Sequence, residues 1–67
     1  MTDWWLDVGD ASPVIAEAKR ILGEPVVDEV YTEGFAPRVR GFQALNGLEA
    51  DGMIDERTLA RMGLRRP

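Results

Sequence analysis

A short pattern of residues occurs twice in this chain, with the second copy 23 positions after the first. A unit this short cannot bury its own apolar side, so two copies predict two similar turn-plus-helix pieces that share one core. The matching positions are Asp28, Tyr31, Phe35, Arg38 and Val39 in the first copy and Asp51, Ile54, Thr58, Arg61 and Met62 in the second.

The length of the chain limits how such a core is built. Its 67 residues allow one domain, and a chain of this size buries only roughly 60% of the surface that it exposes when unfolded. There is no Cys and no His, so disulfides and the usual zinc ligands are absent, and we expect no cofactor or metal. Helical packing is the economical solution, and we predict an all-α fold: a compact three-helix bundle with the turn-plus-helix unit used twice.

The first helix is predicted to run from Ser12-Pro13 to about Leu22. Ser caps free amides, and Pro fits the first helical position, where no amide hydrogen is needed. Gly23 then ends the helix, and Pro25 prevents its continuation. The apolar face consists of Ile15, Ala18 and Leu22, and the side chains expected to point to solvent are those of Glu17, Lys19 and Arg20.

The second helix is predicted to begin at about Ala36, because Pro37 deeper inside a helix would forfeit a backbone hydrogen bond. Gly41 costs roughly 1 kcal/mol relative to Ala in a helix, so we expect another backbone to pass close to it. Asn46-Gly47 supplies a left-handed stop. The predicted buried stripe consists of Val39, Phe42 and Leu45.

The third helix is predicted to span about Glu56 to Met62. Asp55 is placed to cap its free amides, and Ile54 before the cap is expected to pack onto the helix. Gly63 closes it. Between the first two helices, the connection over residues 24–35 contains two apolar pairs, Val26-Val27 and Val30-Tyr31, as anchors or short extended chain.

Charge and hydropathy exclude some classes of partner. The net charge is −4, and the basic residues are not interleaved with aromatics, so we expect no nucleic acid partner. No stretch approaches the roughly 20 apolar residues of a membrane span, and the first residues lack the pattern of a secretory signal. We therefore expect a protein that is made in the cytoplasm and reaches its destination without that signal or a membrane anchor.

Two pairs of acids, Asp28-Glu29 and Asp55-Glu56, raise the question of glycoside cleavage, which uses two carboxyl groups across a cleft. Three short helices leave little room for such a cleft, so we interpret these acids as turn formers and helix caps. Without His, a familiar nucleophilic triad is excluded. Asp51-Gly52 lacks the ligand spacing of a calcium loop. We predict that the chain has no catalytic residues and is not an enzyme.

The order and spacing of a larger set of residues resemble the peptidoglycan-binding-like domain, the small helical module of cell-wall hydrolases and bacteriophage lysins. The resemblance extends from about Leu6 to Leu64 and is most specific from Phe42 to Thr58. It implies a non-catalytic binding module. The motif positions are Asp28, Tyr31, Val39, Phe42, Gln43, Gly47, Leu48, Asp51, Gly52, Ile54 and Thr58.

The first copy departs from the family pattern more than the second. Glu29 stands where the family usually has Gly, Phe35 replaces a Thr, and Lys19 replaces a Gln. Thr32 and Asp55 replace the glycine that ends each turn. Because most of these changes fall on turns and positions expected to be exposed, they affect the ligand more than the fold.

Two adjacent indoles and a basic tail lie outside the helical pattern. We predict three regions: an N-terminal aromatic extension over residues 1–8, the peptidoglycan-binding-like domain over 9–64, and a C-terminal tail over 65–67. Of the two indoles, one is expected to cover the core and the other to contact a partner, with capping and partner contact weighted equally. The predicted partner-binding residues are Trp4, Trp5, Arg65 and Arg66.

Two functions remain open from the sequence. The first is a module that recognises bacterial cell wall, with peptidoglycan or a wall-associated protein as partner, which is what the resemblance implies. The alternative is a bacteriophage virion protein, decorating or cementing a capsid or sitting on a tail, that uses the same fold for protein–protein contact. The alternative follows from the absence of a hydrolase domain and of a secretion signal in this chain.

Overall fold

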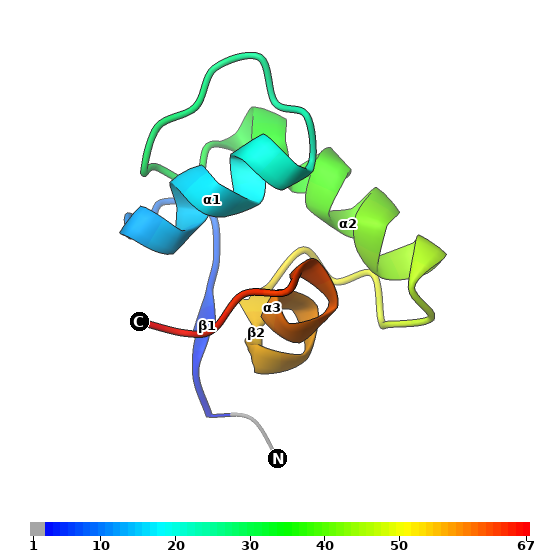
Figure 1. Ribbon diagram of the computed structural model, residues 1–67. Helices are drawn as coiled ribbons and strands as arrows, with labels where there is room; N and C mark the ends of the chain where they lie inside the picture. The colour runs from blue at the N-terminus through cyan, green and yellow to red at the C-terminus, as the bar shows by residue number, and fades with distance from the viewer. Residues whose placement is uncertain (1–2) are drawn as a thin grey trace.

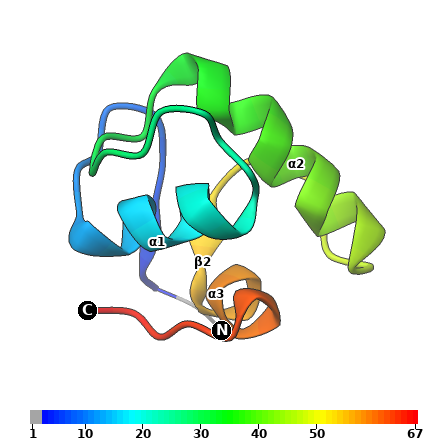
Figure 2. The same ribbon diagram turned by 45° about the horizontal axis from the view of Figure 1, so that its top comes forward.

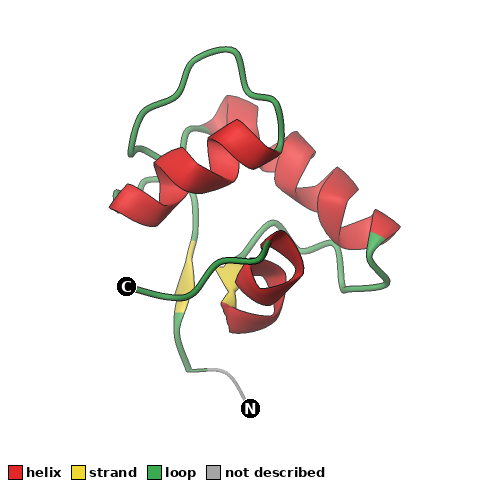
Figure 3. Ribbon diagram, viewed as in Figure 1, coloured by secondary structure: helices red, strands yellow, loops and turns green. Residues whose placement is uncertain are grey.

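The computed structural model of the protein describes residues 3–67. Three helices surround a common centre, as two views show (Figures 1 and 2). A pair of very short strands joins the N-terminal segment to the start of the last helix (Figure 3). This arrangement confirms the predicted three-helix fold. In chain order the elements are β1 (Trp5–Leu6), α1 (Pro13–Ile21), the 3-10 turn η1 (Glu33–Phe35), α2 (Ala36–Leu45), β2 (Ile54–Asp55) and α3 (Glu56–Met62).

The ends of α1 and α3 are set by the predicted residues. The Ser12 hydroxyl accepts a hydrogen bond from the Val14 amide at 3.4 Å, and Pro13 takes the first helical position. The Asp55 carboxylate accepts one from the Thr58 amide at 2.9 Å. Gly63 follows α3 with a φ of 78°, a left-handed conformation that favours glycine.

Helix α2 begins at Ala36 as predicted, but its inward face differs from the prediction. Val39 and Gln43 are buried, whereas Phe42 is half-buried and Leu45 is 89% exposed. Successive residues of a helix are separated by about 100°, so Leu45 lies about 200° from Gln43 and faces away from the core. The expectation that Leu45 belongs to the buried stripe was wrong. Gln43 occupies the inward position instead.

The prediction of a close backbone at Gly41 was also wrong. Apart from its chain neighbours and the backbone of its own helix, a Cβ on this residue would meet no atom of residues 3–67 within 4 Å, so the position is open. Gly41 therefore carries the cost of a glycine in a helix without a packing reason in this domain.

The strand pair was not predicted. Trp5 pairs with Asp55 and Leu6 with Ile54 in antiparallel register. Two residues are too few to show the alternation by which strands are recognised in a sequence. The pairing ties the segment that we predicted as an extension to the body of the domain. Residues 1 and 2 of that segment lie outside the described residues.

The core consists of side chains from all three helices and from the segments that precede them. Trp4, Leu6, Phe42 and Leu64 pack against it and are partly buried. Within residues 3–67, no helix is long and apolar enough to cross a membrane. The buried apolar residues are Val14, Ile15, Ala18, Tyr31, Phe35, Ala36, Val39, Ile54, Leu59 and Met62.

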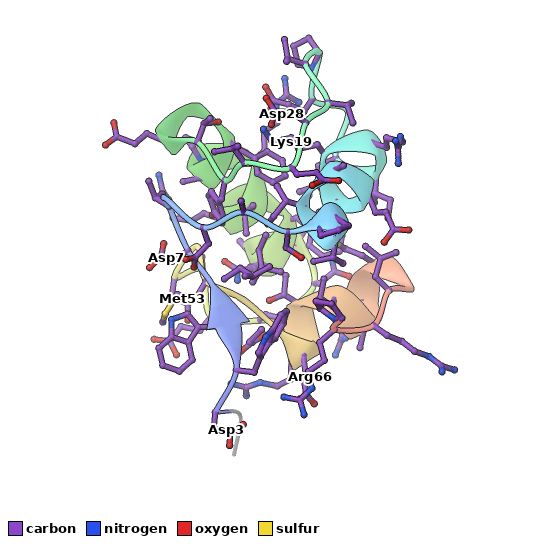
Figure 4. All side chains as sticks on the ribbon, turned by 90° about the vertical axis from the view of Figure 1, so that its left-hand side faces the viewer. Asp3, Asp7, Lys19, Asp28, Met53 and Arg66 are labelled. Carbon is purple, nitrogen blue, oxygen red and sulfur yellow. The ribbon has the colours of Figure 1, made fainter. Side chains whose placement is uncertain are left out.

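Lys19 was expected to point to solvent, and the structure contradicts this. Its side chain is only 2% exposed, with the ammonium 2.6 Å from the Asp28 carboxylate and 5.4 Å from the centre of the Phe35 ring. The long connection between α1 and η1 arches over α1 and brings Asp28 to the lysine (Figures 1 and 4). An ion pair and an aromatic face replace the water that Lys19 loses on burial.

Candidate functional site

The second copy of the repeat is organised around the buried side-chain amide of Gln43. Its Nε2 donates to Asp51 Oδ1 at 3.2 Å, to the Met53 carbonyl at 2.9 Å and to Thr58 Oγ1 at 3.1 Å. Its Oε1 accepts from the Gly52 amide at 2.9 Å. A buried polar group costs free energy unless it is hydrogen-bonded, and here one side chain satisfies groups from the turn and from α3. Gln43 thus fixes helix and turn relative to each other.

The Asp51-Gly52 turn is also held by the first copy. Asp51 Oδ1 accepts from the Met53 amide at 2.9 Å, which closes the turn locally. Gly52 has a φ of 78°, a backbone conformation that residues with a side chain rarely adopt. Its carbonyl accepts a hydrogen bond from the Tyr31 hydroxyl. Burial raises the pKa of Tyr31 to about 12, so the hydroxyl keeps its proton and stays a donor. The motif residues of the turn therefore have structural roles.

A polar hollow of about 110 Å³ opens beside this turn, between the end of α2 and the start of α3. Gln43 and Thr58 reach it from the core, and Gly47 and Leu48 border it where the chain leaves α2. Its charged lining consists of Glu49, Asp51, Asp55 and Arg57. The hollow combines hydrogen-bonding groups of both kinds with one apolar side chain, which suits a small polar ligand group.

Two of the four acids singled out in the sequence, Asp28 and Asp55, close a turn and cap a helix, as predicted. Asp28 closes its turn by accepting from the Val30 amide at 3.2 Å, and Asp55 caps α3. The hydrogen bond from the Lys19 ammonium, with that from Val30, holds the pKa of Asp28 below its ordinary value of 3.8. A general acid needs a raised pKa instead.

The four predicted partner-binding residues lie near one end of the domain. Trp5 is half exposed in β1 and pairs with Asp55, whereas Trp4 is partly buried and packs against the core. Arg66 forms an ion pair of 3.2 Å with Glu56, the residue that follows Asp55. In Figure 4, Arg66 lies toward the same end of the molecule as Asp3, which precedes β1.

Arg65 and Arg66 also line an open depression of about 430 Å³ with Glu56 and Leu64. The structure thus brings the two arginines together, next to the strand that carries Trp5. Of the two indoles, Trp4 packs against the core and Trp5 is the more exposed. Partner contact by these residues stays a prediction.

The sequence analysis did not single out Glu49 or Arg57, which line the hollow. Both stand beside motif residues, Glu49 directly after Gly47-Leu48 and Arg57 directly before Thr58. That placement was the available signal. Charged residues at exposed positions are common on any surface, so this placement becomes informative only once the fold brings the two segments together.

A comparison with protein families finds one model that matches this chain, described as "putative peptidoglycan binding domain", over residues 19–62. The match includes both copies of the repeat and all residues of the Gln43 network. Neither a curated protein nor a solved structure gives a significant match. Because the family model spans most of the chain, the chain belongs to the family of peptidoglycan-binding domains.

Proposed function

We propose that this domain recognises bacterial cell wall by binding peptidoglycan without cleaving it. The observation that carries the proposal is the family match over residues 19–62. The geometry supports it, because the turn with the most specific motif residues borders a polar hollow that opens to the surface. Fold alone does not establish function, so the ligand has to be tested directly.

The chemistry of peptidoglycan suits such a surface. The polymer presents sugar hydroxyls, acetamido groups and short peptides with amides, carboxylates and amines. The hollow offers carboxylate acceptors, the Arg57 guanidinium and the Leu48 side chain. The non-catalytic part of the proposal rests on the acids of the turns, which cap backbone amides, and on the lowered pKa of Asp28.

Co-sedimentation with insoluble peptidoglycan tests the proposal. Purified protein should pellet with the wall material and stay in solution with cellulose, an insoluble polysaccharide without peptides. The supernatant should contain no released sugars or peptides after prolonged incubation. Failure to pellet would refute wall recognition, and release of soluble fragments would refute the non-catalytic role.

We also propose that Trp4, Trp5, Arg65 and Arg66 contribute to partner contact. Deleting the N-terminal residues is a poor test, because Trp5 belongs to the strand that pairs with β2. Trp5→Ser and Arg65→Ser change exposed side chains and keep the backbone pairing. If either weakens pelleting, the surface contributes to wall binding. No feature of residues 3–67 favours the virion alternative, which predicts absent wall binding.

A further inference from the structure

Three consecutive apolar residues are exposed in the connection between α1 and η1. We call residues 23–29 the arch, because this segment rises above α1 (Figure 1). Its tip consists of Pro25, Val26 and Val27, which are all exposed, Val26 by 65% and Val27 by 40%. Single exposed apolar side chains are common on any surface, whereas a run of three favours a functional contact. The tip is therefore a candidate for burial against a partner.

The arch is held in place at its base. Glu24 forms an ion pair of 3.1 Å with Arg38 of α2, and Asp28 forms one of 2.6 Å with Lys19 of α1. A loop that is already ordered loses little entropy when it binds a partner. Glu29 is exposed, and its carboxylate forms no hydrogen bond or ion pair within residues 3–67. The arch thus presents an apolar tip beside one unmatched negative charge.

The depression near the C-terminus has the complementary character. Its volume of about 430 Å³ falls within the roughly 300–1,000 Å³ of pockets that bury a ligand-sized group. Of its lining residues, Arg66 pairs with Glu56 at 3.2 Å, whereas Arg65 is exposed and forms no hydrogen bond or ion pair in the described part of the chain. Leu64 adds apolar surface to the lining. The depression thus offers an apolar contact and one unmatched positive charge.

The two surfaces complement each other in shape and in charge. The arch protrudes and leaves Glu29 unmatched, and the depression leaves Arg65 unmatched. The same difference in sign extends over the chain, since residues 1–33 contain eight acids and two bases, and residues 34–67 contain four acids and six bases. Asp28 in the arch and Arg66 in the depression lie toward opposite ends of the molecule (Figure 4). A contact between the two surfaces therefore joins different copies of the chain.

We infer that the tip of the arch of one molecule inserts into the depression of another, so that copies of this chain associate head to tail. Such a contact uses different surfaces on the two partners, and it continues into a row instead of closing as a dimer. Each copy in a row adds a wall-binding face, which raises the avidity for a repetitive polymer without a new wall contact. The inference names a second copy as the partner of the surface that contains Trp5, Arg65 and Arg66, and to that extent it rests on the proposed function.

Sedimentation equilibrium of the full chain over a range of concentrations tests the inference. The average mass should rise above the 7.5 kDa of a single chain, and pass that of a dimer, as the concentration approaches about 1 mM, the range of weak protein contacts. Association should weaken between about 0.05 M and about 0.5 M salt, because salt screens the attraction between Glu29 and Arg65. A protein that keeps the mass of one chain at about 1 mM refutes the inference.

Two substitutions block the two surfaces separately. Val26→Glu places a charge in the apolar contact and Arg65→Glu places a carboxylate opposite Glu29, so each should weaken association about tenfold or more. The controls are Leu45→Glu and Arg40→Glu, at exposed positions of α2 outside the arch and the depression. The controls should associate like the parent, and all four variants should keep its circular dichroism spectrum because they change exposed side chains. An equal loss in the controls would mean that net charge, not these two surfaces, governs association.

A mixture of the two blocked variants tests the direction of the contact. Val26→Glu keeps an intact depression and Arg65→Glu keeps an intact arch, so the mixture should form dimers with one copy of each and nothing larger. If the mixture stays monomeric while the parent associates, the head-to-tail contact is refuted. The same conclusion follows if Arg65→Glu alone associates like the parent, because the arch would then meet another surface.

The outcomes separate this inference from the proposed function, since self-association is measured without wall material. If the protein pellets with peptidoglycan but keeps the mass of one chain at about 1 mM, the head-to-tail contact is refuted and wall recognition stands. If the protein associates as expected but does not pellet, wall recognition is refuted and the head-to-tail contact stands.

Discussion

The two copies of the repeat share their backbone contacts and differ in the side chains that fill the space between them. In each copy an aspartate accepts from the amide two residues later, Asp28 from Val30 and Asp51 from Met53. In each copy an arginine of the following helix donates to the carbonyl at the end of the preceding helix. Arg38 donates to Leu22 at 3.2 Å and Arg61 to Asn46 at 2.9 Å.

Each copy has two side chains at its centre, which we call its filling, and the two fillings differ chemically. The second copy uses Gln43 and Thr58, two neutral polar side chains joined by a hydrogen bond of 3.1 Å. The first copy has Lys19 and Phe35 at the equivalent places, with the ammonium over the ring. Phe35 offers an aromatic face to the Lys19 ammonium, and Thr58 offers a hydroxyl acceptor to the Gln43 amide, so the two residues of each pair suit each other.

The comparison teaches which part of the unit determines its shape. Turn closure and the arginine contact involve backbone atoms and survive a complete exchange of the filling. The filling decides instead whether the aspartate of the turn is paired with a charged side chain of the chain itself. In the first copy Asp28 is occupied by a lysine of the chain itself, and in the second the turn borders a hollow with available acceptors.

The largest effect is expected from the aromatic residue of the first filling. Phe35→Ala removes a fully buried ring and should cost roughly 3–5 kcal/mol of unfolding free energy. A domain of this size has little more to lose, so the variant should be largely unfolded. Phe42→Ala, at a half-buried position, serves as the comparison and should cost less. Urea titrations measure both, and equal losses would contradict the assignment of Phe35 as the central residue.

The same substitution in the two fillings should have unequal effects. Gln43→Met leaves the buried Gly52 amide without its acceptor and removes the donor to the Met53 carbonyl, at a cost of about 2–4 kcal/mol. Lys19→Met keeps an aliphatic stem against Phe35, and half-exposed Asp28 regains water, so the loss should be less than half of that. Urea midpoints of both variants against the parent check this. A larger loss for Lys19→Met would reverse the proposed roles.

Low pH is expected to weaken the ion pair of the first filling, between Lys19 and Asp28. Because the pKa of Asp28 is lower in the folded chain than in the unfolded one, its ionisation stabilises the fold above the ordinary value of 3.8. This contribution is lost as the pH falls through the folded pKa. The difference in urea midpoint between the parent and Asp28→Asn should therefore be constant above about pH 5 and shrink below pH 4. Glu17→Gln is the control, and an unchanged difference at pH 2.5 would argue against the ion pair.

Much of the fold could be predicted because single residues mark where its helices begin and end. Ser12, Asp55 and Gly63 act through their own backbone neighbourhood, so their roles do not depend on distant contacts. The burial of Lys19 could not be predicted from the helical pattern, because it depends on Asp28 reaching across from a connection without regular structure. The repeat gave no signal either, because its offset of 23 positions places Arg20, not Lys19, opposite Gln43. Lys19 becomes the counterpart of Gln43 only in the structure, where each contacts the aspartate of the following turn.

The candidate site was predictable only in its framework. Gln43, Asp51 and Gly52 were identified as motif positions by the resemblance to the family, and the structure gives each a contact. Glu49 and Arg57 belong to different segments, and nothing local indicates that they line one hollow. Strand β1 was not predicted for a related reason. Its partner strand lies almost fifty positions later, and two residues are too few to show the alternation of a strand.

The smallest effects are expected from the arginine contacts that the copies share. Arg61→Met removes one exposed hydrogen bond to the Asn46 carbonyl and should cost about 0.5–1 kcal/mol. Arg38→Met removes the equivalent bond to Leu22 and also the ion pair with Glu24, where the nitrogen and oxygen are 3.1 Å apart. It should therefore cost slightly more, by up to about 1 kcal/mol. High salt should narrow the gap between the two variants, because it screens the ion pair more than a hydrogen bond to a carbonyl. A gap that persists at 1 M salt would mean that the two contacts differ in packing, and the shared backbone frame would then be less equal than the distances indicate.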